Sequence, residues 1–354
     1  MTSKSFWNPQ LWLACVWREG RAFFTLKDVK RHWLLPFAST VALGGPVLAG
    51  AWSQSLNAGM TASLGALIFL YLPQTAFSHM WRSMAWSCMV MLACYGVGSF
   101  SSSSPILQVP GLIVLTTLAT LYCKSLNLGG PPGSLFFVIA ASIGASSQSA
   151  ESINLLKTAL VAAGCLWGFA VAMIYYSITH SQNASPGHKA SIHPCSKDLG
   201  YSVFIGMVVG SSLLLAQLLG LNNLYWVPIS CLAVIQGSNL RDIWNKQLHR
   251  IVGTFLGIIW ISLLFQAKPE SDWQVAIWIV FLSFVIELTV ARHYAMAVMF
   301  ITPMTILLAN AAQVNESSLW SVTQSRLLDT GIGCASGLFG GICLHFIRRR
   351  NSTT

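Results

Sequence analysis

Residues 200–221 read GYSVFIGMVVGSSLLLAQLLGL and contain no charged side chain. A helix of about 20 apolar residues is long enough to cross the roughly 30 Å hydrocarbon core of a bilayer. The whole 354-residue chain has the same character, because 54% of its residues are hydrophobic and only 8% are charged, whereas a soluble domain carries about 25% charged residues. Its mean hydropathy is +0.62. This composition excludes an ordinary soluble enzyme and predicts a multi-pass membrane protein.

Eleven further apolar segments accompany this one. They lie at 34–52, 58–77, 84–100, 105–123, 133–150, 154–177, 224–240, 251–267, 273–290, 294–312 and 324–346. In lipid every backbone N–H and C=O must be satisfied within its own segment or within a closed barrel, and the alternating strand pattern of a barrel is absent from the sequence. We therefore expect an all-α membrane protein with about twelve transmembrane helices.

The basic residues predict an orientation. Residues 1–33 combine six Lys and Arg with several Trp and Phe residues, which indicates an amphipathic helix on the cytoplasmic membrane surface. With the N-terminus inside, 17 of the 20 Lys and Arg residues fall on the inner side, and such an excess marks cytoplasmic loops. Both termini are thus predicted to be cytoplasmic. The net charge of +10 is assigned to the inner membrane surface, so no nucleic-acid partner is expected.

A weak internal repeat suggests two halves. A shift of 168 residues places Arg82 over Arg250, and a shift of 172 places Lys157 over Asp329. We predict two parallel six-helix repeats related by a pseudo-twofold axis along the membrane normal. The predicted organisation is an arm (1–33), a first repeat (34–179), a cytoplasmic linker (180–199), a second repeat (200–346) and a basic tail (347–354).

The second half resembles a known family. The residues that carry the resemblance are Tyr225-Trp226-Val227-Pro228, Gln236, Arg250, Gly253-Thr254, Gly257, His293-Tyr294-Ala295, Phe300-Ile301-Thr302-Pro303, Arg326-Leu327-Leu328-Asp329-Thr330 and Gly333. In this order they are similar to the signature of the fusaric acid resistance and aromatic acid exporter family. Longer members carry a soluble domain between their halves, in the place of the short linker here.

The resemblance implies an exporter of weak organic acids, often aromatic carboxylic acids, in a bacterial inner membrane. It also implies a periplasmic adaptor of the membrane fusion type as a partner and, in some relatives, an outer-membrane channel. The sequence is compatible with a monomer and with a homo-oligomer.

Motifs for catalysis are missing from the sequence. It contains no Walker A loop, no G-x-S-x-G and no H-E-x-x-H, and its few carboxylates are scattered. His180, His188, His193 and Cys195 are too irregularly spaced to predict a metal site. We expect neither enzyme activity nor a cofactor.

Charged residues inside the apolar segments point to function, because one such residue at mid-bilayer costs about 2.5–3.5 kcal/mol. Asp329 follows Arg326 by three residues, so the two either form a local ion pair or, through the repeat, Asp329 faces Lys157 across the two halves. Arg292 follows Glu287 by five residues and lies too far around the helix for an easy local pair, so Glu287 is predicted to be a proton carrier, to pair with Arg250 or to reach interfacial water.

Other residues suggest a path for an anion. Arg82 and Arg250 either anchor the inner surface or together form a cationic vestibule that gathers anionic substrate. Pro303 after Thr302 predicts a helix break, and broken helices often line transporter sites; a simple kink is the alternative. Aromatic rings near these residues either stack on an aromatic acid or belong to the interfacial belt. The candidates for the substrate and proton pathway are Asp329, Glu287, Arg326, Lys157, Arg250, Arg82, Tyr225, Trp226, Gln236, Tyr294, Thr302 and Pro303.

The leading hypothesis is a proton-coupled exporter of small organic anions that works by alternating access, with a polar route between the two halves. The alternative is a membrane scaffold that transports nothing and anchors a periplasmic adaptor or an envelope-assembly complex.

Overall fold

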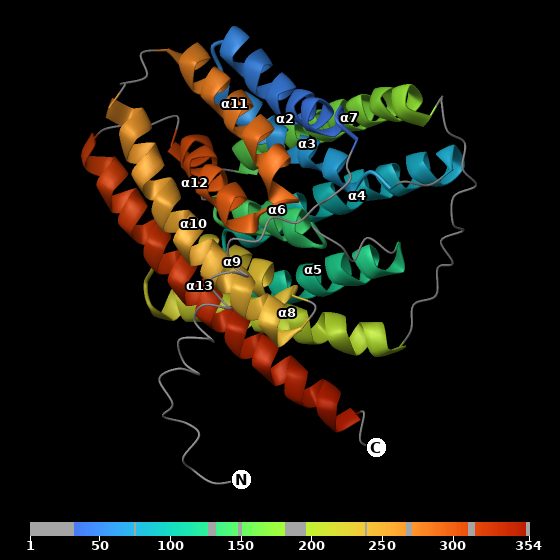
Figure 1. The fold of residues 1–354 in the computed structure, drawn as a ribbon, viewed down its shortest axis with the longest axis vertical. Helices are drawn as coiled ribbons and strands as arrows, with labels where there is room; N and C mark the ends of the chain where they lie inside the picture. Colours follow the sequence, from blue (N-terminus) through green and yellow to red (C-terminus); the bar gives the residue numbers. More distant parts are fainter. Residues whose placement is uncertain are drawn as a thin grey trace, which may run out of the picture.

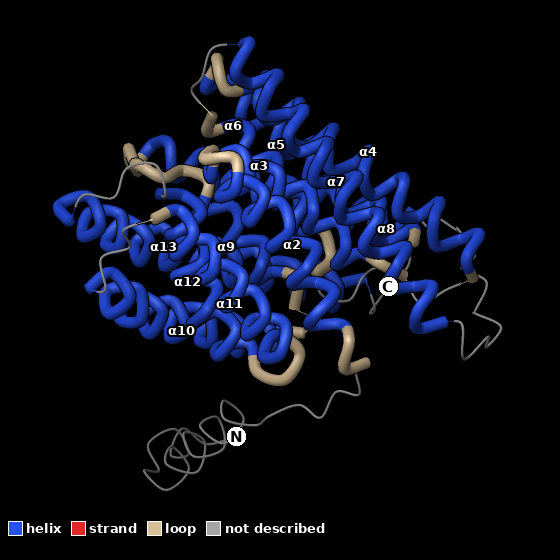
Figure 2. Tube along the Cα trace, turned by 90° about the horizontal axis from the view of Figure 1, so that it is seen from above, coloured by secondary structure: helices blue, strands red, loops and turns tan. Residues whose placement is uncertain are grey.

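A computed structural model describes residues 32–73, 76–126, 132–147, 151–180, 196–237, 239–266, 271–310 and 316–351. Within these ranges the secondary structure is entirely helical, as Figure 2 shows. The predicted amphipathic arm lies almost wholly outside the described residues, as does most of the predicted linker. The all-α class is as predicted.

Each predicted apolar segment contains a helix. The described helices are α2 (Leu35–Trp52), α3 (Leu56–Ala66) continued by the short 3₁₀ helix η2 (Leu67–Tyr71), α4 (Phe77–Ser101), α5 (Pro105–Ser125), α6 (Leu135–Ala145), α7 (Glu151–His180), α8 (Ser196–Leu218), α9 (Trp226–Ile235), α10 (Leu240–Gln266), α11 (Asp272–Val290), α12 (Tyr294–Asn310) and α13 (Glu316–Asn351). The last helix continues through Arg349 and Arg350, into the predicted basic tail.

Helix length supports eight of the twelve predicted spans. Eight of the described helices are long and apolar enough to cross a membrane, whereas the helices at 56–71, 135–145, 226–235 and 294–308 are shorter. At 1.5 Å per residue the ten residues of α9 cover only about 15 Å, half of the hydrocarbon core. Hydropathy alone predicted twelve spans because buried short helices are as apolar as spanning ones.

Long and short helices alternate in the same order in both halves. From α2 to α7 the order is long, short, long, long, short, long, and it recurs from α8 to α13. The contacts recur as well. In the first half α3 packs on α7 and α4 packs on α6 and α7, and in the second half α9 packs on α13 and α10 packs on α12 and α13.

The halves meet along two edges and in the middle. Helix α5 packs on α8, and α2 packs on α11. In Figure 1 the helices α10 and α13 lie on the left, α4 and α7 lie on the right, and the short helices α6 and α9 lie between them in contact with each other. All ten residues of α9 are buried, which places this helix in the interior.

Glycines set the register between long and short helices. A Cβ on Gly164 or Gly168 of α7 would collide with the carbonyl oxygens of Ala62 and Ala66 in α3, and Gly333 and Gly337 of α13 approach the carbonyls of α9 in the same way. Only a residue without a side chain permits such close packing. The two glycine pairs are offset by 169 residues.

This offset corrects the register of the predicted repeat. With it, Lys157 corresponds in position to Arg326 rather than to Asp329, and Asp329 corresponds to Leu160. The gapless shift of 172 residues was wrong because few identities constrained it.

Candidate functional site

Three charged side chains are buried in the second half. Arg250 on α10 is 6% exposed, Arg326 on α13 is 3% exposed and Asp329 on α13 is fully buried. They lie against α9 and α12, so the buried charges sit within the second half and not between the halves as predicted. Burying charge in an apolar helix bundle is costly unless the charge has a function or a partner.

Arg250 is held by hydroxyl groups. It follows the start of α10 at Leu240 by ten residues, which is about 15 Å along the helix. Its Nη1 donates to the Tyr294 hydroxyl oxygen at 3.1 Å, and its Nη2 donates to Ser230 Oγ at 3.2 Å. The Nε atom is buried and makes no hydrogen bond. Glu287, the partner considered from sequence, is therefore not the group that binds Arg250.

Arg326 lies flat on an aromatic ring. Its guanidinium carbon is 3.2 Å from the ring centroid of Trp226, and its Nη2 donates to Thr305 Oγ1 at 3.3 Å. A cation–π contact of this kind contributes about 0.5–2 kcal/mol. The Nε and Nη1 atoms are buried without a hydrogen bond. Tyr225 packs beside Trp226, with 4.7 Å between ring centroids.

Asp329 has no hydrogen-bond partner on either carboxylate oxygen. It interacts electrostatically with Arg326, but the predicted direct ion pair at i,i+3 does not form, because Arg326 is turned onto Trp226 and Thr305. The pair with Lys157 does not form either, since Lys157 Nζ donates to Ser147 Oγ at 2.9 Å in the first half. The carboxylate is thus buried beside a guanidinium that is bonded elsewhere.

The two guanidinium groups are close to each other. Trp226, under Arg326, and Ser230, bonded to Arg250, are four residues apart on α9 and so lie about one turn, or 5.4 Å, apart on one face. Arg250 and Arg326 also interact electrostatically. With Asp329 ionised, the cluster of Arg250, Arg326 and Asp329 carries a net charge of +1 and has three nitrogen atoms that lack an acceptor. An anion is the ligand that would satisfy it.

Other predicted residues lie elsewhere. Arg82 is exposed near the start of α4, so it does not share a buried vestibule with Arg250. Glu287 is half-buried on α11, which packs on α2 and α12. Helix α12 continues through Pro303, so the discontinuous helix considered from the sequence does not form, whereas the alternative of a proline inside a continuous helix agrees with the structure. Thr302 is buried, and its hydroxyl donates to the Val298 carbonyl at 2.9 Å.

Gln236 joins the two halves instead of lining the charged cluster. Its Nε2 donates to Ser134 Oγ at 3.0 Å, and its backbone carbonyl accepts a hydrogen bond from Lys246 Nζ at 3.2 Å. The amide reaches Ser134 because Gly133, at φ +55°, has no Cβ, and a Cβ there would lie 2.9 Å from Gln236 Oε1.

Sequence reasoning missed two residues of the site. Ser230 and Thr305 are the hydroxyl groups that bind the two arginines. Single Ser and Thr residues are common in membrane helices, where they bond back to their own helix, so their position along an apolar segment gives no signal. Ser230 lies four residues after Trp226 and Thr305 lies two residues after Pro303. These positions indicate a role only when the structure shows where the two arginines lie.

A family comparison matches this half. Residues 203–340 match the family described as fusaric acid resistance protein-like. Over 144 residues the chain is 29% identical to the "Uncharacterized membrane protein YvaC" of Bacillus subtilis (strain 168); the match covers 39% of this chain and 22% of that protein, so it spans about a fifth of the relative. No solved structure matches the chain.

The matched residues include all three members of the charged cluster, and the eight long apolar helices make the chain a multi-pass membrane protein. The family resemblance seen in the sequence is confirmed for the second half, where residues 203–340 match the fusaric acid resistance protein-like family.

Proposed function

We propose that this protein exports small organic anions, in the first place aromatic carboxylic acids, across a bacterial inner membrane, and that it acts as a transporter and not as an enzyme. The observation that carries the proposal is the pair of buried guanidinium groups, Arg250 and Arg326, whose three unbonded nitrogen atoms lie inside a bundle of apolar helices. A carboxylate of the substrate accepts these N–H groups and balances the excess positive charge.

The aromatic preference rests on the surroundings of the arginines. Trp226 and Tyr225 stand at the start of α9 and Tyr294 at the start of α12, so aromatic rings flank the charged cluster at both ends. One face of Trp226 is covered by Arg326. An aromatic acid then places its carboxylate on the arginines and its ring against the remaining aromatic surface.

For the transport cycle we propose alternating access by movement of two six-helix halves related by a pseudo-twofold axis along the membrane normal. The recurring order of long and short helices and the recurring contacts support this arrangement. Coupling to protons is assigned to Asp329, a buried carboxylate beside the anion site, with Glu287 on α11 as the second candidate.

The test of the proposal is transport of labelled benzoate in proteoliposomes. Arg250→Met and Arg326→Gln should each reduce the transport rate at least about tenfold, whereas the matched control Arg82→Gln, an exposed arginine on α4, should transport as the wild type does. Equal rates in all three variants would remove the buried arginines from the mechanism.

Proton coupling is tested separately. An imposed pH gradient should drive benzoate movement in the wild type, and Asp329→Asn should abolish this drive while benzoate exchange at equal pH persists. If Asp329→Asn keeps the drive and Glu287→Gln loses it, the coupling belongs to Glu287.

The adaptor and the outer-membrane channel are proposed from the family resemblance alone. Chemical cross-linking in the native membrane, followed by purification of this chain, should recover a periplasmic adaptor. If the organism's genome encodes no adaptor, and deletion of the gene for this protein still removes resistance to aromatic acids, the partnership is contradicted. The transporter proposal then remains intact. If the deletion strain loses an envelope complex but transports aromatic acids normally, the result would instead support the alternative function, a membrane scaffold that transports nothing.

A further inference from the structure

We propose that Asp329 sets the charge of the transported anion, so that the site accepts singly charged carboxylates and rejects doubly charged ones. This inference rests on the proposed function, and it concerns which anions the same site takes. It follows from the number of charges that the fold buries together and from the way their atoms are bonded.

The first step is the position of the carboxylate. Asp329 is fully buried, and neither of its oxygens accepts a hydrogen bond. A carboxylate kept only to neutralise Arg326 would be expected to bond to it, because a direct pair recovers part of the desolvation cost of both groups. Instead Arg326 is bound by Trp226 and Thr305. The negative charge of Asp329 therefore acts on the site mainly through space.

The second step is the charge of the site. In the state of the cycle in which Asp329 has released its proton, Arg250 and Arg326 contribute two positive charges and Asp329 one negative charge, which leaves one positive charge to be balanced by the anion. A monoanion makes the site neutral. A dianion would bury one excess negative charge in a region of low dielectric constant, next to a carboxylate that already lacks a partner.

The third step is negative selection. Specificity often depends on a repulsive group placed against the wrong ligand as well as on attraction of the right one. Without Asp329 the same cluster would hold two uncompensated guanidinium groups and would match the charge of a dianion. Asp329 is thus a residue that determines specificity through its charge.

The experiment measures the concentrations of benzoate and isophthalate that give half-maximal transport at neutral pH, where the first is a monoanion and the second a dianion. The wild type should prefer benzoate. Asp329→Asn should shift the ratio of the two values toward isophthalate at least about tenfold, because one unit charge is removed within several ångströms of the ligand. Asp198→Asn, which removes a partly exposed carboxylate paired with Lys124 outside the cluster, should leave the ratio unchanged.

A second pair of variants separates charge from structure. Arg326→Gln leaves a neutral site and should weaken benzoate transport about tenfold or more. The double variant Arg326→Gln/Asp329→Asn restores the net charge of +1 and should recover a preference for benzoate over isophthalate. A purely structural role for Asp329 predicts that the double variant is worse than either single variant. If the single variant Asp329→Asn does not fold, the comparison of the double variant with Arg326→Gln still shows whether the charge of Asp329 determines the preference for benzoate.

The outcomes distinguish the inference from the proposed function. If the wild type and Asp329→Asn transport both acids with the same ratio, or the double variant fails to recover, the inference about charge selection is wrong and the exporter stands. If the wild type neither binds nor transports benzoate or isophthalate, the proposed function fails, and the inference fails with it.

Discussion

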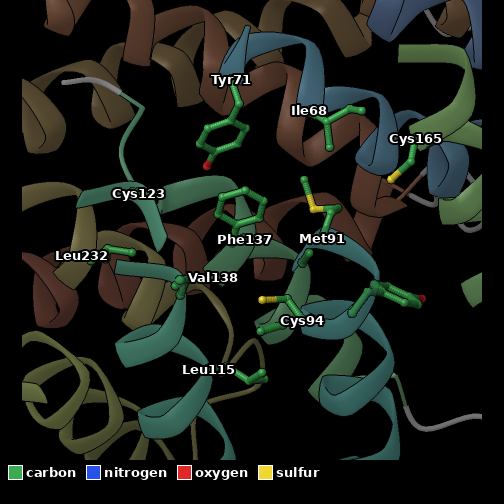
Figure 3. Packing of buried hydrophobic residues seen from close by; sticks show 14 of the residues in the cluster. Ile68, Tyr71, Met91, Cys94, Leu115, Cys123, Phe137, Val138, Cys165 and Leu232 are labelled. Atoms are coloured by element: carbon green, nitrogen blue, oxygen red, sulfur yellow. The ribbon is translucent and has the colours of Figure 1, made fainter. Parts of the chain in front are cut away.

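The interiors of the two halves differ although their helices are arranged alike. In the first half, α4 and α6 bury an apolar cluster in which Tyr71 stacks on Phe137 at 4.3 Å, next to Met91 and Cys94, as Figure 3 shows. In the second half, α10 and α12 bury Arg250 and its hydroxyl partners. The same scaffold thus holds an apolar core on one side and a charged cluster on the other.

The difference can be traced to single positions. Gly98 of α4 approaches the Ala141 carbonyl of α6, and Gly257 of α10 approaches the Met299 carbonyl of α12. Met91 of α4 is fully buried and so is most of Arg250 of α10, and each lies on a long helix that packs on a short one, α6 and α12 respectively. The first half therefore buries apolar side chains, while the second half buries charges at a cost in stability, which the proposed anion site explains.

The largest expected effect comes from placing an arginine in the apolar half. Met91→Arg should destabilise the protein by about 3 kcal/mol or more, because Met91 is fully buried in an apolar cluster and the hydroxyl groups of Ser87 and Tyr122 on that side are already hydrogen-bonded to each other. Thermal unfolding in detergent measures the change, with Met91→Leu as the control. An arginine tolerated here would show that water reaches this core and that the two halves are equivalent.

The reverse exchange should affect function more than stability. Arg250→Met removes a buried charge but leaves Tyr294 and Ser230 without their partner, so we expect a loss of stability of about 1–3 kcal/mol together with loss of benzoate binding. Ligand-dependent stabilisation in detergent checks both. If Arg250→Met bound benzoate as tightly as the wild type, the assignment of the anion site to the second half would be wrong.

A smaller effect is expected at the ring under Arg326. Trp226→Leu removes the cation–π contact, which contributes about 0.5–2 kcal/mol, and frees Arg326 to move toward Asp329. Transport should slow, and the affinity for benzoate should fall because the guanidinium then pairs with the carboxylate. Trp167→Leu, a tryptophan on α7 of the first half whose Nε1 donates to the Val41 carbonyl, serves as the matched control. An unchanged affinity in Trp226→Leu would mean that the ring does not hold Arg326 in place.

The smallest effect is expected where the halves are tied by a surface ion pair. Lys124 Nζ on α5 lies 2.7 Å from Asp198 Oδ1 on α8, and the two side chains are 28% and 35% exposed. Such a pair contributes less than about 1 kcal/mol. Lys124→Met should change neither the unfolding midpoint appreciably nor the choice between benzoate and isophthalate. A large loss of transport would show that this contact is part of the conformational cycle.

Parts of the candidate site could be read from the sequence. Arg250, Arg326 and Asp329 stand out because charged residues are rare in apolar segments, and the order of motifs around them identified the family half. The sequence did not show how these residues pair. The i,i+3 spacing favoured a bond between Arg326 and Asp329, but Trp226 on α9 competes for the guanidinium, and no local pattern reveals a contact about 100 residues away.

The sequence by itself determined that this chain is a helical membrane protein, where its helices lie and that Arg250, Arg326 and Asp329 are among the charges within its apolar segments, because the absence of water in lipid makes both apolar runs and charges conspicuous. Only the tertiary structure decided which helices are too short to span, how the two halves correspond and which hydroxyl groups hold the arginines. Those features depend on packing between distant segments, where a glycine against a carbonyl or a ring under a guanidinium fixes the register.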